Sequence, residues 1–573
     1  MLLTWLKILG ILSIILSDGL PKDKTIFISP VKIPLLLSAN FGELRPDHYH
    51  SGIDIKTQGA IGKEIVASAD GYISRITVSP AGFGRALYIR HPSGFTTVYG
   101  HLDKFSPEIE EYVREQQYEK KSFLITLYPP KDKFSFRQGN LIAYSGNSGS
   151  SGGPHLHFEI RRTDSEMPVN PLHFEFGTGD NIEPVIEKLV IYPVNKYSEI
   201  NNQRSLKKIN VSGGNGNYYI PADNEIRISG IAGFGIKSFD LLNDSYNKCA
   251  VYSIELEIDS IKRFRYIMDS FSFSESRYIN SHIDYATYEE ENYFIERAFK
   301  LPNDKLSAYK EVINRGLFNF SDNKLHHISI TVTDIHKNKS VLSFKVRSVP
   351  PSNGRSYGQD SKELKIMPYN KSNRFESEDI SLAIPYGALY DTLFFDYSRS
   401  DGSAGMLSDM HHVHNSLTPL HKSARLLIKP SKIPAGMDSK MFIAYSGQDR
   451  QRIAQSSTWE NGYLAADVMS FGKYYIDIDT IAPVISPVGF SSGAVLTGKK
   501  TLKIKITDDF SGIRSYVPEI DGKWALFEYD QKNSLLIYEF DEKRIEKGNK
   551  HSLSLRVTDS KENSATYKCS FTW

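Results

Sequence analysis

The sequence predicts a mainly β protein built from several modules in a row. Its 573 residues are about 3.8 times a typical domain of about 150 residues, which indicates three to four domains. The 33 tyrosines and 31 phenylalanines are residue types that favour strands. Short segments of alternating apolar and polar residues are separated by Gly, Pro, Asn and Asp turn signals, which is typical of antiparallel β domains.

The overall composition excludes several classes of protein. The chain is 40% hydrophobic and 24% charged, which is ordinary for a folded soluble protein and excludes a disordered or fibrous chain. The formal net charge is only +2, so no nucleic acid is expected as a partner. Cys249 and Cys569 are the only cysteines, which excludes a disulfide framework and a Cys-based zinc cluster. Two unpaired buried thiols are favoured over one bridge.

Residues 1–19 predict a signal peptide. Lys7 precedes an apolar run at 8–16, which is shorter than the ~20 residues that a membrane span requires, and small residues follow it. The alternatives are a buried N-terminal strand or a membrane-associated segment. No cysteine follows the run, so no lipid anchor is expected there. We expect an exported mature chain, in the periplasm or extracellular envelope, without a membrane-spanning segment.

Residues 26–175 predict the first folded unit. Strand patterns such as 72–78 and 86–90 alternate with turn signals such as Asp70-Gly71. One helix interrupts them. Ser106-Pro107-Glu108 combines an N-cap hydroxyl, a proline at the first helical position and an acidic first turn. The following residues up to Lys121 contain no Gly or Pro, so a helix is expected there.

The rear of the chain contains an internal repeat. Residues 326–338 (HHISITVTDIHKN) and 551–563 (HSLSLRVTDSKEN) share the alternation, the Val-Thr-Asp and an Asn four residues later. Residues 235–239 (GIKSF) and 512–516 (GIRSY) are expected to be their matching upstream strands. The first copy then carries an insertion with helix-like stretches within 265–315. We predict two Ig-like β-sandwich modules, at 190–349 and 481–573; chance similarity is the alternative.

A third β module of uncertain type is expected at 360–478. A Pro- and Gly-containing linker at 349–354 precedes it, and alternating segments such as 425–428 and 474–478 lie within it. Thr480-Ile481-Ala482-Pro483 marks the boundary to the last module.

Histidines in the first unit indicate a metal site. His50 and Asp54 are four residues apart in the segment HSGID, and an extended backbone places both on one face. His155 and His157 share one side of a predicted strand whose other side, with Leu156 and Phe158, faces a core. Burying two imidazoles side by side on a strand costs free energy unless their polar atoms have a partner, and a divalent metal ion is such a partner. The alternative is a set of unrelated histidines at strand edges.

Zinc suits such a donor set. Two imidazole nitrogens and one carboxylate oxygen leave a fourth position open for water, which distinguishes a catalytic from a structural zinc. The metal lowers the pKa of its water to about 7 and polarises a carbonyl. A histidine that does not bind the metal can take a proton or hold an oxyanion.

Six blocks in order closely resemble the lysostaphin-type zinc metallopeptidases over residues 36–172. They are 41–45 (FGELR), 50–54 (HSGID), 69–71 (ADG), 99–102 (YGHL), 146–149 (GNSG) and 152–161 (GGPHLHFEIR). The resemblance implies a small antiparallel β peptidase domain and an endopeptidase of bacterial peptidoglycan. It also implies one Zn²⁺ per chain.

The resemblance also implies roles for individual residues. His50, Asp54 and His157 correspond to the zinc ligands. His155 corresponds to the histidine that orients or deprotonates the attacking water, and His101 to the one that stabilises the transition state. Phe158 and Glu159 complete the motif as structural or supporting residues.

An insertion at 105–136 departs from the family pattern. It separates His101 from Gln138-Gly139, two segments that are usually close, and contains the predicted helix. We expect this insertion to border the cleft and to influence substrate range or regulation.

Other polar groups carry weaker signals. His411, His412, His414 and His421 form a second histidine group, for which a solvated polar loop is favoured over a metal site. Asp334 and Asp559 follow Val-Thr in both repeats, which favours turn capping over calcium. Asp508 is likewise interpreted as a turn residue.

The function predicted from the sequence is zinc-dependent hydrolysis of peptide cross-links in peptidoglycan. The alternative is a non-catalytic wall-binding or amidase-regulating envelope protein. A third hypothesis, an assembly or adhesion protein, has little support because the four tryptophans do not cluster. Peptidoglycan is the expected partner, and the C-terminal β modules are expected to position the enzyme or bind an envelope protein.

Overall fold

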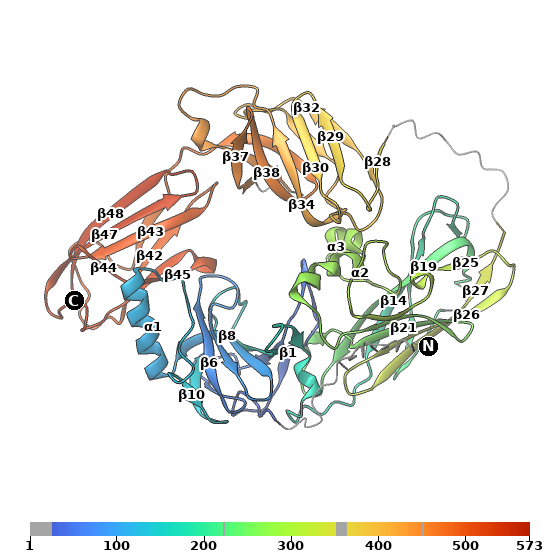
Figure 1. The fold of residues 1–573 in the computed structure, drawn as a ribbon, viewed down its shortest axis with the longest axis horizontal. Helices are drawn as coiled ribbons and strands as arrows, with labels where there is room; N and C mark the ends of the chain where they lie inside the picture. The colour runs from blue at the N-terminus through green and yellow to red at the C-terminus, as the bar shows by residue number, and fades with distance from the viewer. Residues whose placement is uncertain (1–25, 222–223, 351–363, 448–451) are drawn as a thin grey trace, which may run out of the picture.

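A computed structural model describes residues 26–221, 224–350, 364–447 and 452–573, and Figure 1 shows its arrangement. The predicted signal peptide at 1–19 lies outside these residues. The described chain is mainly β, as predicted, and its α-helices are α1 (Pro107–Lys120), α2 (Ile279–His282) and α3 (Tyr285–Glu291). None of the described helices has the length and apolar character that a membrane span requires. Cys249 and Cys569 are both free and buried.

The first domain, residues 26–175, contains an antiparallel sheet. Its main path is β1 (Leu37–Ala39), β4 (Ile53–Lys56), β12 (His155–Arg162), β8 (Phe95–Phe105), β7 (Arg85–Arg90), β6 (Gly71–Val78) and β10 (Ser135–Phe136). The central strand β12 places Leu156 and Phe158 in the core. Successive side chains of a strand point to opposite faces, so His155 and His157 lie on the other face.

Helix α1 begins where the sequence predicts. Pro107 is its first residue, and Glu108 and Glu110 lie in its first turn. It ends at Lys120, and the capping residue Lys121 adopts the left-handed conformation. The Ser106 hydroxyl makes no capping hydrogen bond. Instead the Glu110 carboxylate turns back and accepts a hydrogen bond from the Phe105 backbone amide at 2.9 Å, so the acidic first turn performs part of the expected capping.

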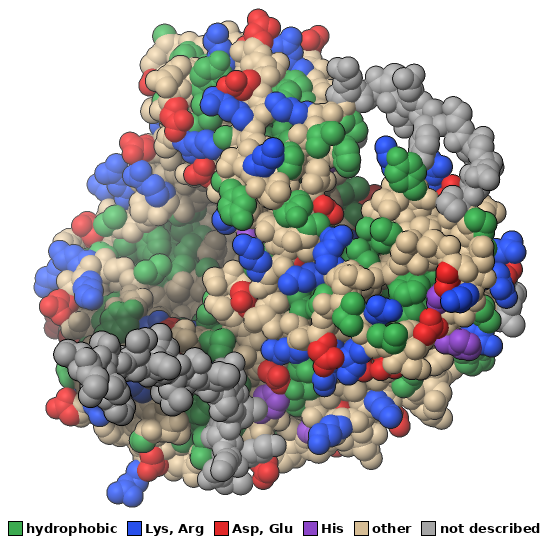
Figure 2. Space-filling view, turned by 45° about the vertical axis from the view of Figure 1, so that its right-hand side comes forward, with side chains coloured by type: hydrophobic (Ala, Val, Ile, Leu, Met, Phe, Trp, Pro, Cys, Tyr) green, Lys and Arg blue, Asp and Glu red, His purple; other side chains and the backbone are tan. Residues whose placement is uncertain are grey.

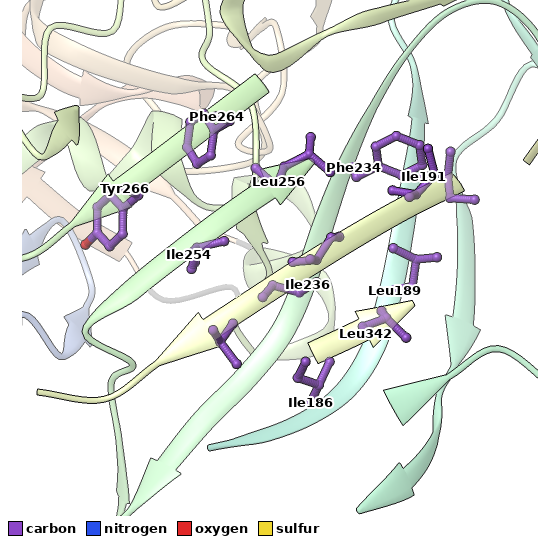
Figure 3. Packing of buried hydrophobic residues seen from close by; sticks show 14 of the residues in the cluster. Ile186, Leu189, Ile191, Phe234, Ile236, Ile254, Leu256, Phe264, Tyr266 and Leu342 are labelled. Atoms are coloured by element: carbon purple, nitrogen blue, oxygen red, sulfur yellow. The ribbon is translucent and has the colours of Figure 1, made fainter. Parts of the chain in front are cut away.

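The second module, residues 185–349, is a large sheet system folded around one core. Its main strands are β14 (Val185–Pro193), β19 (Arg227–Leu241), β27 (Lys339–Ser348), β26 (Leu325–Thr333), β21 (Ser253–Ile258) and β22 (Ile261–Ile267). Leu189, Phe234, Ile254 and Leu342, each from a different strand, fill this core (Figure 3). Helices α2 and α3 lie within 265–315, where the sequence predicts helical stretches.

The two repeated segments form equivalent hairpins. β26 pairs with β27, and β47 (Lys550–Asp559) pairs with β48 (Ser564–Thr572). The upstream segments of the two copies both lie in strands but differ in their pairing. Residues 512–516 overlap β43 (Ile513–Ile520), which pairs with β47, whereas residues 235–239 lie in β19 and the strand beside β26 is β21. A five-residue alternation identifies a strand but not its neighbour, because the pairing is a long-range choice.

The third module, residues 364–478, has two five-stranded sheets. One runs β29 (Asn373–Ser377), β30 (Ile380–Ile384), β34 (Pro419–Ile428), β38 (Tyr463–Ser470) and β37 (Ser457–Glu460). The other runs β32 (Tyr397–Ser400), β33 (Met410–Val413), β39 (Gly472–Ile478), β35 (Met441–Ser446) and β36 (Arg452–Gln455). Leu382 and Leu426 from the first sheet share a core with Ile443 and Ile476 from the second, so the sheets pack face to face.

The fourth module, residues 481–573, also has two sheets around one core. The first runs β40 (Val484–Val488), β42 (Thr501–Thr507), β46 (Leu535–Glu539) and β45 (Phe527–Asp530). The second runs β41 (Ala494–Val495), β48, β47, β43 and β44 (Lys523–Trp524).

The four units follow one another around a closed ring, in which the fourth module lies beside α1 of the first domain (Figure 1). Arg114 pairs with Glu539 at 2.9 Å and Glu111 with Lys543 at 2.8 Å. Tyr118 meets Trp524 edge to face. On the face shown in Figure 2, acidic and basic side chains are interspersed, in keeping with the net charge of +2.

Candidate metal centre

The three predicted metal ligands lie together in the first domain. The Asp54 Oδ1 atom is 3.0 Å from His50 Nε2 and 3.0 Å from His157 Nδ1, and the two nitrogens are 3.1 Å apart. The sheet register causes this, because β4 pairs with β12 so that Asp54 lies directly opposite His157. His50 comes from the loop before β4, and all three side chains are buried.

Glycine at position 52 allows this loop to approach β12. A Cβ atom at Gly52 would lie 2.4 Å from the Phe158 carbonyl oxygen and 2.8 Å from the Glu159 Cγ atom. Real side chains do not tolerate such contacts, so the HSGID segment needs glycine between its two ligand positions.

The hydrogen bonds of the two histidines fit a metal ion. His50 Nδ1 lies 2.7 Å from the Asn40 carbonyl oxygen, which only accepts, so this nitrogen carries the proton and Nε2 presents a lone pair. His157 Nε2 donates to the Glu159 carboxylate at 2.9 Å, which leaves the Nδ1 lone pair facing Asp54. Three acceptors therefore converge, and a cation satisfies them together. Tetrahedral zinc with bonds of about 2.0–2.2 Å separates its ligands by about 3.3–3.5 Å, close to the distances found.

Buried partners hold the three side chains in place. Glu159 is fully buried and also accepts hydrogen bonds from Ser51 Oγ and Arg161 Nε, both at 2.5 Å. Arg45 Nη2 donates to the second oxygen of Asp54 at 3.2 Å. Sequence reasoning gave Glu159 a supporting role but assigned none to Asn40 or Arg45. Arg45 lies in the FGELR block, and this block was the sequence signal that could have identified it as a partner of the site. No local sequence pattern identifies Asn40 as such a partner. Such partners fix ligand orientation.

The charge balance favours a positive ion at this point. Burial opposes the charged form of Asp54, but His50, His155 and His157 hold its pKa well below the usual range. Burial likewise opposes ionisation of Glu159, but the Arg161 charge and His157 lower its pKa to about 2. Burial also disfavours charged His157, yet hydrogen bonds to Asp54 and Glu159 raise its pKa to about 9. The carboxylates are thus ionised and attract either a proton or a metal.

His155 and His101 stand beside the three ligands. His155 Nδ1 donates to the Gly153 carbonyl at 2.8 Å, and its Nε2 lies 3.5 Å from Asp54 Oδ1. His101 Nδ1 donates to the Ser148 carbonyl at 2.8 Å. Their ring centroids are 4.8 Å apart. Burial, with the neighbouring histidines, lowers the pKa of His101 to about 3, so its ring is neutral and its Nε2 lone pair can accept a hydrogen bond.

The backbone of His101 is also unusual. Its φ is 59°, a left-handed conformation that non-glycine residues rarely adopt and that concentrates at functional sites. The pairing of β8 with β7 is irregular at this point, because the register shifts between Arg85 and Leu87, whose partners are Leu102 and Tyr99.

A cavity of about 520 Å³ opens over the centre. The first domain contributes His48, Phe83 and Ser151, together with the five histidine and aspartate side chains described above. The second module contributes Phe273, Ser276 and Arg277. Two units of the chain therefore form the walls of one cleft.

The expectation that residues 105–136 border this cleft is wrong. None of the cavity-lining residues comes from that segment. Ile109 and Val113 of α1 pack into the domain core, and its charged side pairs with Glu539 and Lys543 of the fourth module. The surface charges of α1 thus pair with the fourth module and not with the cleft, which the position of the insertion in the sequence had indicated.

The second histidine group does not converge. His411 is buried on β33 and hydrogen-bonds to the Tyr397 hydroxyl at 3.0 Å. His414 contacts Thr418, and His421 stacks on Tyr278 with ring centroids 4.2 Å apart. The prediction of a solvated polar loop is wrong for His411, which is buried in strand β33 with the Tyr397 hydroxyl as the partner of its Nδ1 atom.

Two segments of the chain match known domain families. Residues 48–118 match peptidase family M23, and residues 364–479 match the Zu5-like domain. The second match covers the module that the sequence left without a type.

Three relatives illustrate the similarity. An uncharacterized metalloprotease of Haemophilus influenzae is 34% identical over 131 residues, 23% of this chain and 21% of that protein. The DD-carboxypeptidase/endopeptidase Mpg of Neisseria meningitidis is 33% identical over 129 residues, 22% of this chain and 23% of that protein. The murein hydrolase activator NlpD of Salmonella dublin is 33% identical over 125 residues, 22% of this chain and 26% of that protein. The aligned part thus spans about a fifth to a quarter of each relative.

Among solved structures, the catalytic domain of lysostaphin from Staphylococcus simulans is 21% identical. The similarity covers 24% of this chain and 90% of that chain, with a TM-score of 0.18, too low to bear on function. The family match at residues 48–118 and the ordered sequence blocks agree: this segment of the chain matches peptidase family M23, and the first domain is similar to the lysostaphin-type zinc metallopeptidases.

Proposed function

We propose that this protein is an exported zinc endopeptidase that hydrolyses peptide cross-links of bacterial peptidoglycan. The observation that carries the proposal is the convergence of His50, Asp54 and His157, with two further histidines, on one open cavity. The periplasm or the extracellular envelope is the proposed location, because peptidoglycan lies there.

In this proposal His50 Nε2, Asp54 Oδ1 and His157 Nδ1 hold one Zn²⁺. Zinc supplies Lewis acidity, which lowers the pKa of water and polarises the scissile carbonyl. Asn40 and Glu159 keep both imidazoles in the tautomer that presents a lone pair. Arg45 holds the second oxygen of Asp54 and so prevents the carboxylate from turning away.

His155 acts as the general base in this scheme. Because Gly153 accepts from its Nδ1, its Nε2 is unprotonated and available for the proton of the attacking water. Once protonated, the same nitrogen can pass that proton to the leaving amine. His101 has the matching tautomer and lies beside His155. Its neutral Nε2 can accept a hydrogen bond from the attacking water, and in this way His101 is proposed to help stabilise the transition state.

The cleft between the first domain and the second module is proposed to hold the peptide. Phe273 offers an exposed apolar surface in the wall. Arg45 and Arg277 line the same cavity, and peptide cross-links carry carboxylates that such guanidinium groups can bind.

A non-catalytic role is the second candidate. The sequence identity to the murein hydrolase activator NlpD over the aligned residues is 33%, the same percentage as for the DD-carboxypeptidase/endopeptidase Mpg. An activator does not need all five side chains of the centre, whereas this chain retains them, which favours the peptidase. The two roles predict different results when no other hydrolase is present.

Mass spectrometry of purified wall fragments after incubation with the mature chain tests the proposal. The zinc-loaded chain should release peptides cut at cross-links, the metal-stripped chain should release none, and added Zn²⁺ should restore the products. Full activity in a rigorously metal-free sample would contradict the zinc mechanism. Products that arise only when a separate murein hydrolase is added would instead support the activator role.

A further inference from the structure

Outside the peptidase centre, two groups of three aspartates converge in the described chain. Asp180, Asp240 and Asp334 bring carboxylate oxygens within 4.8 Å of one another, and so do Asp479, Asp508 and Asp559. Asp180 and Asp479 lie in the connectors that lead into the second and fourth modules. Asp334 and Asp559 occupy the same place in the two repeated hairpins.

The two groups share much of their framework. Asn338 Nδ2 donates to Asp334 Oδ2 at 2.7 Å and to the Asp180 carbonyl at 3.1 Å. Asn563 makes the same pair of bonds, with the same lengths, to Asp559 and Asp479. The turn capping predicted for Asp334 and Asp559 is therefore present in both hairpins, but it does not distinguish the two groups.

The groups differ in how well their carboxylates are satisfied. Asp240 is only 2% exposed, and its Oδ1 atom has no hydrogen-bond partner among the described residues. The Asp180 Oδ2 atom is buried and unpartnered in the same way. Backbone amides donate to carboxylates of both groups: Asn243 and Asn338 to Asp180 and Asp334, and Ser511, Gly512 and Asn563 to Asp479, Asp508 and Asp559. Among the described residues, no carboxylate oxygen of the second group is buried without a partner, so the unpartnered oxygens of Asp180 and Asp240 are the difference between the groups.

Nearby positive charge differs as well. The Lys561 ammonium interacts electrostatically with Asp479 and Asp559. No described Lys, Arg or His makes an ion pair within 4.0 Å of Asp180, Asp240 or Asp334; the His336 ring interacts electrostatically with Asp334 from further away. Burying three carboxylates together without an ion pair is costly, and two of their oxygens are left without a partner among the described residues.

We propose that Asp180, Asp240 and Asp334 form a binding site for Ca²⁺ at the junction between the first domain and the second module. The donors are all oxygen, which suits a hard cation rather than zinc. A Ca²⁺ ion lies about 2.3–2.6 Å from each ligand, so oxygens up to about 4.6–5.2 Å apart can share it, as the observed spacing allows. Ca²⁺ also accepts irregular geometry, whereas Mg²⁺ demands a near-ideal octahedron.

The surroundings provide access and a consequence. A cavity of about 260 Å³ beside the group is lined by Asp180 and His336, by residues 34–37 of the first domain and by residues 242–244 of the second module. An ion there ties the connector to β19 and to the β26–β27 hairpin. The ion thereby stabilises the position of the second module against the first domain, and the second module carries the Phe273–Arg277 wall of the peptidase cleft.

Equilibrium dialysis with radioactive Ca²⁺ on the full chain, kept saturated with Zn²⁺, tests the site. The wild type should bind one Ca²⁺ with a dissociation constant of about 10⁻⁵–10⁻³ M. Asp240→Asn, which keeps the shape of the side chain, should lose that ion. Asp508→Asn in the other group and Asp132→Asn on the exposed surface each remove one charge and should keep it. No Ca²⁺ on the wild type, or an ion lost from Asp508→Asn but kept by Asp240→Asn, would overturn the assignment.

Thermal unfolding separates a cation site from a structural role. Millimolar Ca²⁺ should raise the melting temperature of the wild type by about 3–10 °C and leave that of Asp240→Asn unchanged. Without Ca²⁺ the variant should melt at or above the wild type, because burial, with Asp334 and Asp180 nearby, disfavours the charged form of Asp240 and raises its pKa to about 8. A variant that melts below the wild type by the same amount with and without Ca²⁺, or equal shifts with Mg²⁺, would refute the proposal.

Discussion

Replacing His155 and His157 one at a time separates a metal ligand from a proton acceptor. The two side chains are two residues apart on β12 and face the same cavity. His157→Ala removes one of three converging donor atoms and leaves only His50 and Asp54. His155→Ala leaves all three donors at 3.0–3.1 Å from one another.

The expected magnitudes differ accordingly. His157→Ala should lower zinc affinity by several orders of magnitude, since a catalytic zinc normally has three protein ligands. It should also destabilise the fold by about 1–3 kcal/mol, because the fully buried Glu159 loses one hydrogen-bond partner. His155→Ala should keep one zinc per chain but lower turnover about 10²- to 10⁴-fold, which corresponds to about 2.7–5.5 kcal/mol of activation free energy.

The assay measures metal content by mass spectrometry, melting temperature, and hydrolysis of wall fragments at saturating Zn²⁺. His327→Ala, which removes an exposed histidine on β26, is the matched control and should change none of them. Zinc lost from His155→Ala but retained in His157→Ala would reverse the two roles. Unchanged rates in both variants would show that the chemistry lies elsewhere.

Three further predictions concern the neighbouring units. Phe273→Ala should raise KM about 3- to 10-fold with little change in kcat, because it removes cleft surface rather than a reacting group. Phe394→Ala, which changes an exposed residue of the third module, should leave KM unchanged. A Phe273→Ala variant that loses kcat alone would contradict the prediction. Hydrogen bonds to Asp259 and Asp322 outweigh burial and raise the pKa of His326. The stabilising effect of His326 is therefore complete below the unfolded pKa of about 6.5 and is lost as the pH rises through the folded pKa. The melting temperature of the wild type should fall between pH 6 and 9 by an amount that His326→Gln lacks, and an equal pH dependence of both melting temperatures would refute this. Glu528→Lys places a cation beside Arg85, which is 6% exposed and pairs with Glu528, so small-angle scattering should show a larger radius of gyration. Glu562→Lys should leave the radius of gyration unchanged, because its partner Arg514 lies in the same module. An unchanged radius in both variants would mean that the contact between Arg85 and Glu528 does not hold the ring closed.

The sequence by itself determined the local part of the centre. Alternation along β12 places His155 and His157 on one face and Leu156 and Phe158 in the core, because side chains alternate along any strand. The HSGID spacing and the start of α1 at Pro107 are equally local. These features depend on residues within a few positions of one another, so periodicity and capping are sufficient to predict them.

Only the tertiary structure decided what lies opposite each of these elements. Phe273 and Arg277 form a wall of the cleft although they follow His50 by more than 200 residues, and α1 contacts the fourth module instead of the cleft. Asp180, Asp240 and Asp334 meet because separate strands and a connector bring them together. Pairing and packing of distant segments depend on the summed burial and charge of whole surfaces, and no local pattern in the chain records that sum.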